Sequence, residues 1–396
     1  MYTKKARLPI LIIIMTLCTG LLSGCDDTPQ EPLVFGVIMG SALDDHGWSE
    51  AHYEAGTYVE ENLENAQMLT FDKLNAADNP NLRVEQVVDT MVTQGAQLIF
   101  TVSDDFQDDT DQVAEKYSNV TFINISGDHA LDDGSPQNLG NYMGKMEFTT
   151  AIAGCHAALA TETGHIGYVG PLINNETRRL VNASYLGARY CYEHYRGLDP
   201  DTLNFTVAWI GFWFHLPGVT LDPTEVSQNF IDSGVDVLMS GIDTTESIVV
   251  AGQRAEQGAR VYAIPYDYRN ACDLAPEICL GVPYFNWGPG YLEIAEKVQD
   301  DVWKKHWTWA EPDWTDINNL ETSAAGYLFG PGTSDAWKTD VETYITHLSE
   351  NHWNGLFVGP LNWQDGTPWL AEGDVATERA IWNTPQLLEG IEVVSQ

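Results

Sequence analysis

Short apolar runs alternate with amphipathic stretches from residue 33 to about residue 284, and this alternation limits the folds open to the chain more than any other feature. Residues 33–39 form an apolar run of strand length, and Val84, Val87 and Met91 recur at helical spacing in residues 81–94. Strands that alternate with helices in this way form parallel sheets with helices on both faces. The sequence therefore predicts an α/β fold.

The alternation occurs twice, with a restart near residue 146. A chain of 396 residues is too long for one simple core, so each series predicts a doubly wound parallel-sheet lobe of its own. We expect lobe one to comprise residues 33–145 with part of 286–334, and lobe two to comprise residues 146–284. A further helix is expected over residues 291–305. Residues 335–396 are expected to form a C-terminal helix and an irregular extension rich in Gly, Pro and Trp.

The start of the chain resembles the leader of a bacterial lipoprotein. Lys4, Lys5 and Arg7 precede an apolar run that is too short to span a bilayer comfortably. The run ends in Leu22-Ser23-Gly24-Cys25, which resembles the lipobox of that class. In lipoproteins the cysteine of this motif is lipidated and becomes the first residue of the mature protein.

This resemblance implies a lipoprotein signal peptide over residues 1–24, lipidation at Cys25 and a tether over residues 25–32. The folded part is then lipid-anchored at the cell membrane and faces the periplasm or the exterior. Two alternatives stay open from the sequence: an ordinary secreted protein in which Cys25 has no special role, and an uncleaved membrane anchor.

The charge of the chain excludes two classes of partner. There are 57 Asp and Glu residues against 19 Lys and Arg residues, which gives a formal net charge of −38. Nucleic acids and anionic lipid surfaces would be repelled by such a protein, so we expect no nucleic-acid partner. The acidic residues are dispersed along the chain, which indicates a solvated acidic surface on a folded protein.

Four cysteines remain if Cys18 is removed with the signal peptide and Cys25 takes the lipid. Disulfides form readily outside the cytoplasm. Cys272 and Cys279 would close a short loop, so we expect them to pair, which leaves Cys155 to pair with Cys191. Four reduced, buried cysteines are the alternative. No Cys-x-x-Cys or clustered His spacing accompanies them, so no metal site is expected.

Ligands of parallel α/β folds bind beyond the carboxyl ends of the strands, and the loops in those places carry a series of motifs. Residues 45–54, Asp-His-Gly-Trp-Ser-Glu-Ala-His-Tyr-Glu, resemble the Asp-x-Gly-aromatic-Asn-Gln-x-x-Tyr-Glu signature of the basic membrane protein family. Further segments match that family in the same order: Phe106-Gln107-Asp108, residues 138–154, residues 164–170, Asn286-Trp287-Gly288 and residues 359–366.

Members of that family are bacterial substrate-binding lipoproteins of ABC importers, best known for purine nucleosides. The resemblance implies a periplasmic-binding-protein-like fold of type I, with two lobes joined by a hinge. It implies a small neutral solute, most simply a purine nucleoside or nucleobase, with no cofactor, an ABC permease as partner, and a monomer. Residues 240–245 and 266–270 depart from the family pattern, which leaves the exact ligand open.

A planar heterocycle needs flat apolar surfaces on both faces and hydrogen-bond partners at its edge. Trp48 and Trp213 are the expected stacking residues, and Phe212 is the alternative to Trp213. The Phe-Gln-Asp segment places Phe106 at the ligand as well. Trp287 lies where the chain is expected to cross between lobes and is a further candidate. Packing in a lobe core is the alternative role for each of these aromatic side chains.

Carboxylates are the expected partners of the ligand's N–H and O–H groups. Asp108 suits the edge of a base, with Asp104 and Asp105 as nearby alternatives and helix capping as its other role. Asp243 and Asp267 follow strands of lobe two and suit the two hydroxyls of a ribose, because a carboxylate accepts two O–H bonds at once.

Asp45 precedes Trp48, and its role is either to fix that loop or to contact the ligand. Capping of a loop or helix is the alternative role for Asp243 and Asp267 too. Each of the three carboxylates therefore has a structural role and a binding role that the sequence leaves open.

Other functions are less consistent with the sequence. It contains no Gly-x-Ser-x-Gly elbow, no P-loop and no His-Glu-x-x-His motif, so no catalytic residues are assigned and an enzyme is not expected. A ligand-sensing lipoprotein of a signalling system would have the same fold and cleft. A quaternary amine held by aromatic faces is the alternative ligand class.

Overall fold

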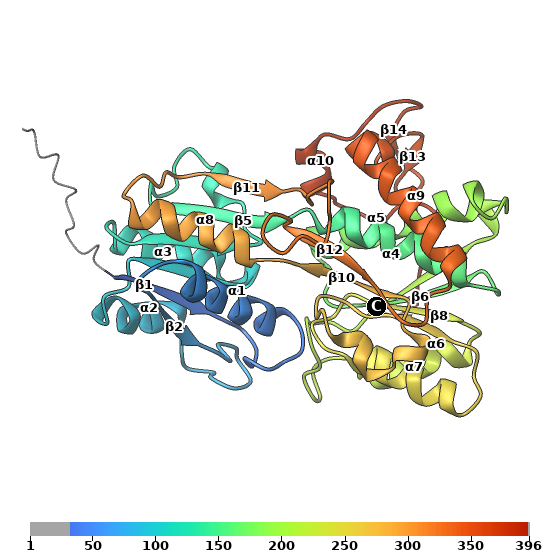
Figure 1. Ribbon diagram of the computed structural model, residues 1–396, viewed down its shortest axis with the longest axis horizontal. Helices are drawn as coiled ribbons and strands as arrows, with labels where there is room; N and C mark the ends of the chain where they lie inside the picture. The colour runs from blue at the N-terminus through green and yellow to red at the C-terminus, as the bar shows by residue number, and fades with distance from the viewer. Residues whose placement is uncertain (1–31, 395–396) are drawn as a thin grey trace, which may run out of the picture. The chain divides into compact units, whose positions relative to one another are not determined.

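The computed structural model describes residues 32–394 (Figure 1). The predicted signal peptide, Cys25 and the predicted tether up to residue 31 lie outside the described residues. Across residues 32–394, no helix is both long enough and apolar enough to cross a membrane.

The first series of elements forms a six-stranded sheet in the order β11-β5-β4-β3-β1-β2, and every neighbouring pair is parallel. Its strands are β1 (Leu33–Ile38), β2 (Ala66–Phe71), β3 (Leu98–Thr101), β4 (Thr121–Ile125), β5 (Leu139–Gly144) and β11 (Trp307–Ala310). The helices around it are α1 (Trp48–Asn62), α2 (Val84–Thr93), α3 (Gln107–Lys116) and α8 (Gly288–Gln299). We call the part of the chain around this sheet lobe one.

The second series forms a five-stranded parallel sheet in the order β15-β7-β6-β8-β9. Its strands are β6 (His165–Gly170), β7 (Asn204–Trp209), β8 (Val237–Ser240), β9 (Tyr262–Ile264) and β15 (Ile391–Val393). Its helices are α4 (Met146–Ala160), α5 (Asn175–His194), α6 (Pro223–Asp232) and α7 (Glu246–Glu256). We call the part of the chain around this sheet lobe two. The predicted α/β fold with two parallel sheets is confirmed.

Burial on both faces explains the composition of the central strands. Every residue of β3 and of β8 is buried, as expected for strands that helices cover on both faces. Their sequences, Leu-Ile-Phe-Thr and Val-Leu-Met-Ser, are accordingly apolar runs without alternation. Because these strands are apolar at every position, the sequence shows where they lie. It does not show which residues point to which face of the sheet.

Helices α4 and α5 approach each other unusually closely. A Cβ atom at Gly154 would lie 1.8 Å from the carbonyl oxygen of Ser184, and one at Gly187 would lie 2.0 Å from that of Ala151. The contact therefore requires glycine at both positions. A disulfide bond between Cys155 and Cys191 joins the same two helices, and a second joins Cys272 to Cys279.

The chain passes between the two sheets three times. The first passage runs from β5 into α4 at Lys145, and the second from β10 (Gly281–Phe285) into α8. The third runs from β11 to β12 (Ala325–Phe329), which pairs with β10 in antiparallel register. Figure 1 shows β10 and β12 between the two sheets. The exact lobe boundaries at residues 145 and 284 stay a prediction.

The C-terminal part is more ordered than its sequence indicates. The helix expected at the start of residues 335–396 is present as α9 (Asp335–Asn351), but the stretch after it is not simply irregular. It contains β13 (Leu361–Asn362), β14 (Pro368–Leu370), α10 (Glu378–Trp382) and β15, which pairs with β7 and extends the sheet of lobe two. Strands of two or three residues are too short to leave a periodic signal.

The helix expected over residues 291–305 is shifted and shorter in the structure. It begins at Gly288 and ends at Gln299. Asp301 adopts a positive φ of 53°, a left-handed conformation that ends a helix. Residues 300–305 therefore lie outside the helix, although Val302 and Trp303 are apolar.

Candidate functional site

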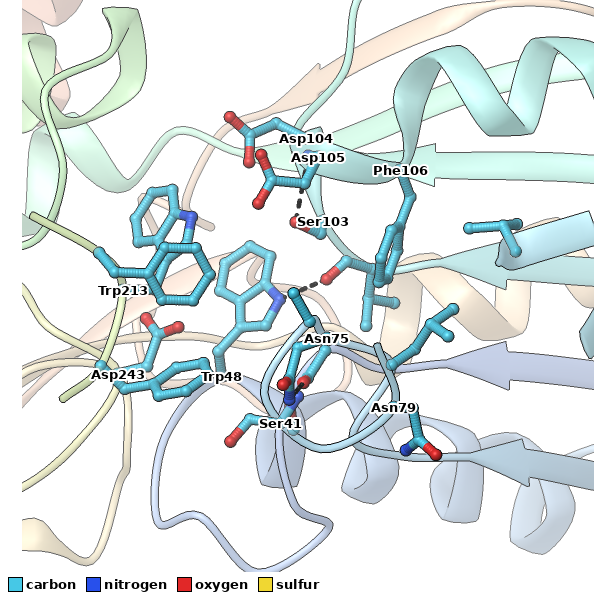
Figure 2. Close-up of a pocket in the computed structure, with 18 of the residues that line it drawn as sticks. Ser41, Trp48, Asn75, Asn79, Ser103, Asp104, Asp105, Phe106, Trp213 and Asp243 are labelled. Carbon is cyan, nitrogen blue, oxygen red and sulfur yellow. Dashed lines mark hydrogen bonds between the residues drawn. The ribbon is translucent and has the colours of Figure 1, made fainter. Parts of the chain in front are cut away.

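A cavity of about 280 Å³ lies where the carboxyl ends of the two sheets meet. The segments that follow β1, β2, β3 and β4 line it from lobe one, and those that follow β6, β7 and β8 line it from lobe two. This is the edge at which parallel α/β folds bind their ligands. The side chains that reach it are therefore the candidate binding residues (Figure 2).

Trp48 is the first residue of α1 and a wall of the cavity. Its indole Nε1 donates a hydrogen bond of 2.7 Å to the carbonyl oxygen of Val102, at the end of β3. The rings of Phe285 and Trp287 meet it edge to face, with centroids 5.6 and 5.3 Å away. Lobe one and the adjoining passage thus fix the orientation of the indole before any ligand arrives.

Trp213 lines the same cavity from lobe two, in the loop after β7. Phe212 and Phe214 on either side also line it and pack edge to face, with ring centroids 5.0 Å apart. Figure 2 shows Trp213 and Asp243 on one side of Trp48 and Phe106 on the other. The two expected stacking residues and Phe106 are therefore brought together in one cavity.

Asp243 is the carboxylate of lobe two that faces the cavity. Its side chain is 7% exposed, and no hydrogen-bond partner reaches its Oδ1 atom within residues 32–394. Its backbone N–H donates to the carbonyl oxygen of Trp213 at 3.0 Å, which ties the two binding loops together. Burial raises the pKa of Asp243 well above its usual value, and the charges of Asp45 and Asp267 add to the rise.

Lobe one contributes carboxylates from the end of β3. Asp104, Asp105 and Asp109 line the cavity, as does Glu176 from the start of α5 in lobe two. Burial raises the pKa of Asp104 to about 7, and the charges of Glu176 and Asp105 act in the same direction. The lining is acidic as well as aromatic.

Hydrogen bonds cross the cavity from lobe to lobe. Asn174, the N-cap of α5, donates from Nδ2 to the carboxylate of Asp104 at 2.9 Å. The hydroxyl of Ser126, which follows β4, bonds to the carboxylate of Glu176. Gly47 lies so close to the carbonyl oxygen of Asp243 that a Cβ atom would be 1.8 Å from it. The two lobes are in contact around the cavity.

Asp45 and Asp108 are not among the described residues that line the cavity. Asp45 accepts hydrogen bonds from the backbone N–H groups of Gly47, Ser49 and Glu50 at 3.0 to 3.1 Å, which holds the loop that leads into Trp48. Asp108 is an exposed residue in the first turn of α3. Its alternatives Asp104 and Asp105 do face the cavity.

Asp267 and Trp287 also lie outside the described cavity lining, behind its walls. Asp267 is 1% exposed and its Oδ1 accepts from the backbone N–H of Phe285 at 3.4 Å. Trp287 is stacked between Phe285 and His52, with ring centroids 4.5 and 4.4 Å away. Among the described residues, no partner reaches the indole nitrogen of Trp287. Trp287 contacts Trp48 directly, and Asp267 holds the backbone of Phe285, whose ring also packs on Trp48.

Some residues of the site were missed in the sequence. Glu176 and Asn174 follow β6, the one long strand of lobe two whose following loop carries no family motif. The position of that loop at the carboxyl end of a central strand was the available signal. Arg83, Asn75 and Asn79 line the cavity from the loop after β2, which the sequence marks only as polar.

The described part of the chain holds no group of three or more His, Cys, Asp or Glu side chains arranged to bind a metal ion. The carboxylates of the cavity are spread over its walls rather than converging on one point. The arrangement suits a small organic solute that stacks on aromatic rings and donates hydrogen bonds to carboxylates.

Comparisons with known proteins agree with this geometry. Residues 33–310 match the family model Bmp, described as ABC transporter substrate-binding protein PnrA-like. A purine-binding protein from Brucella abortus (strain 2308) is 28% identical over 381 residues, which cover 96% of this chain and 99% of that protein. A Haloferax volcanii protein named for glucose binding in an ABC transporter is 27% identical over 269 residues, 68% of this chain and 62% of that protein.

Solved structures share the fold. An ABC transporter solute-binding protein from Aeropyrum pernix K1 superposes with a TM-score of 0.64 at 14% identity, covering 84% of this chain and 93% of that one. One from Conexibacter woesei gives a TM-score of 0.59 at 17% identity. Together with the two parallel sheets, this likeness confirms the predicted type I periplasmic-binding-protein-like fold.

Proposed function

The chain belongs to the Bmp family of PnrA-like ABC transporter substrate-binding proteins, and on that premise we propose that it captures a purine nucleoside or nucleobase for an ABC permease. The family consists of binding proteins and not enzymes, so the cavity residues are assigned to binding. One observation carries the choice of ligand: Trp48 from lobe one and Trp213 from lobe two line one cavity together with buried carboxylates.

The proposed binding mode places the flat base against the indoles of Trp48 and Trp213. The carboxylates of Asp104 and Asp243 then accept hydrogen bonds from N–H or O–H groups at the edge of the ligand. Phe106 closes the cavity on the side of lobe one. The Brucella abortus relative, whose name states purine binding, supports this choice over a sugar.

Binding from two lobes couples capture to closure. A ligand that contacts both lobes favours the conformation in which they are close together, because it binds that conformation more tightly. The three passages of chain between the sheets are the proposed hinge. The closed, loaded form is the one that the permease would receive, and a monomer is sufficient for this role.

We also propose that the protein acts outside the cytoplasm with a lipid on Cys25. The lipobox-like sequence that ends at Cys25 supports this anchor. Cells fed an alkyne-tagged fatty acid should label the wild-type protein and leave a Cys25→Ser variant unlabelled. A wild-type protein that stays unlabelled would exclude the lipid anchor.

The stacking proposal is tested by Trp48→Ala. Removal of a central aromatic contact should weaken purine binding by about 2 kcal/mol or more, roughly thirtyfold. Trp48→Phe keeps a flat ring and should lose less, while Trp303→Ala alters an indole outside the cavity lining and should leave the affinity unchanged. Calorimetric titration measures the affinities, and circular dichroism checks the fold. Equal affinities for wild type and Trp48→Ala would show that the purine binds elsewhere.

A further inference from the structure

The charges that line the cavity are strongly unbalanced. Five carboxyl side chains line it, and the one lysine or arginine among its described lining residues is Arg83. The carboxyl side chains are those of Asp104, Asp105, Asp109, Glu176 and Asp243. They come from both lobes, so the imbalance is a property of the assembled cavity and not of one loop.

Asp243 marks the place where this imbalance is least compensated. The residue is only 7% exposed, it lines the cavity, and its Oδ1 atom has no hydrogen-bond partner in the described structure. Figure 2 shows its carboxylate close to the space between Trp48 and Trp213. A buried carboxylate without a partner is costly, and this cost is why the pKa of Asp243 is raised in the protein without ligand. A cation bound beside it would remove the cost and let the group ionise, and the protein itself supplies no such partner to Oδ1.

The two buried lysine or arginine side chains of residues 32–394, Lys145 and Arg179, are already engaged. Arg179 donates from Nε to the carboxylate of Glu147 at 2.5 Å and lies 4.2 Å over the ring of Trp382. Its Nη2 atom is 3.8 Å from Glu176, too far for a hydrogen bond. Lys145 is held by Glu311 and Glu378 at 2.9 and 2.6 Å. None of these contacts neutralises Asp243.

The aromatic lining favours the same kind of ligand. The faces of aromatic rings attract cations, most strongly where water is excluded, and tryptophan is the best of them. Trp48, Trp213, Phe106, Phe212 and Phe214 line the cavity that holds the five carboxyl groups. A flat ring with a positive charge would contact the aromatic faces and pair with an ionised Asp243, whereas a neutral ring brings no charge that favours the ionised form.

We infer that the solute is bound as a cation, with its positive charge placed between Asp243 and the indoles of Trp48 and Trp213. This inference rests on the proposed role of the cavity as the solute site. The substrate class is thus a cationic heterocycle, such as a purine alkylated on a ring nitrogen, rather than a neutral nucleoside. Asp104 from lobe one and Glu176 from lobe two are further acidic residues of the same lining.

Matched ligands test the charge directly. 1-Methyladenosine is a cation at neutral pH, and its isomer N6-methyladenosine is neutral; adenosine is the unmethylated reference. Choline and its uncharged carbon analogue 3,3-dimethylbutan-1-ol form a second pair without a purine ring. Calorimetric titration of residues 26–396 with each probe should find the cation bound at least roughly tenfold more tightly than its neutral partner, since the desolvated charge contributes a cation–π contact and an ion pair.

Variants assign the preference to the cavity. In Asp243→Asn the ratio between the cationic and the neutral ligand should fall toward one. Asp273→Asn removes the same charge from an exposed position of lobe two and should keep the wild-type ratio, which controls for the overall negative charge. If Asp243→Asn does not fold, Asp104→Asn should lower the ratio in the same direction. The comparison of cationic with neutral ligands on the wild-type protein tests the inference even if neither variant folds.

The outcomes separate this inference from the proposed function. Adenosine or N6-methyladenosine bound as tightly as 1-methyladenosine would overturn the inference and leave the purine proposal standing. Choline preferred over its neutral analogue, with no purine bound, would support the cation and contradict the purine. No binding of either cationic probe would overturn the inference. A ratio that is equally reduced in Asp273→Asn would also overturn it, because the effect would then come from net charge.

Discussion

Asp267 shows how burial sets the behaviour of a single carboxyl group. It is 1% exposed, it adopts a φ of 64°, and burial raises its pKa from 3.8 to about 8. The folded protein therefore keeps a proton that the unfolded chain releases near pH 4. Between about pH 4 and pH 8 the folded state binds more protons than the unfolded state, so stability falls as pH rises through this window.

Asp267→Asn should remove this dependence at one position. Asparagine has nearly the same shape, stays uncharged and tolerates a positive φ better than most residues. We expect a melting temperature several degrees above that of the wild type at pH 8 and little difference at pH 4. Differential scanning calorimetry across this range measures both. Asp273→Asn should not alter the pH profile, and an Asp267→Asn variant that does not differ from the wild type at pH 8 would refute the buried-proton account.

The residues of the site were predictable to different degrees. Trp48 and Trp213 could be placed because each follows a recognisable strand and an aromatic motif. Asp108 was expected at the ligand, whereas Asp105 and Asp109 line the cavity. These two residues are four apart and share a face of the turn that begins α3, and Asp108 points to another face. A short 3-10 turn over Asp104–Phe106 precedes α3 and determines which of these side chains turn toward the cavity. The sequence gives no signal for where this turn starts.

The start of α1 is the element that brings the two lobes into contact. Asp45 holds its first turn through three backbone N–H groups, and Gly47 lies against the carbonyl oxygen of Asp243 in lobe two. The φ of Gly47 is −160°, so its glycine is required by the close approach and not by a left-handed backbone. Gly47 thus sets how close the lobes can come.

Gly47→Ala should therefore impair ligand binding by holding the lobes apart. The added Cβ atom would lie 1.8 Å from the carbonyl oxygen of Asp243, so one loop must move away. We expect affinity to fall at least roughly tenfold, about 1.4 kcal/mol, while the protein stays folded. Gly134→Ala is the control, since nothing lies within 4 Å of a Cβ atom there. Unchanged affinity in Gly47→Ala would show that this contact does not limit closure.

At the level of elements, the order of strands and helices was predictable and the C-terminal part was not. Helix α2 carries an apolar face and β3 is a continuous apolar run, and patterns of these two kinds are visible in the sequence. β11 and β15 join their sheets as edge strands far along the chain from their neighbours β5 and β7. Such pairings depend on tertiary packing, which a local pattern does not record.

At the scale of the molecule, a network behind the cavity connects the lobes through the C-terminal part of the chain. Lys145 lies at the first passage between the sheets and binds both Glu311 and Glu378, which follow β11 and begin α10. Arg379 and the indole nitrogen of Trp382 both contact the carboxylate of Asp128 in lobe one, at 3.4 and 3.1 Å. Contacts on this side and around the cavity together set the balance between open and closed forms.

The central claim is that this balance responds to a purine held between Trp48 and Trp213. The most direct test expresses residues 26–396, removes any bound solute by unfolding and refolding, and follows tryptophan fluorescence during titration with a panel of solutes. The panel comprises adenosine, guanosine, inosine, 1-methyladenosine, free nucleobases, uridine, choline and glucose. The account predicts saturable quenching by purines at micromolar concentrations and no response to glucose. A saturable response to glucose, with none to any purine, would contradict it.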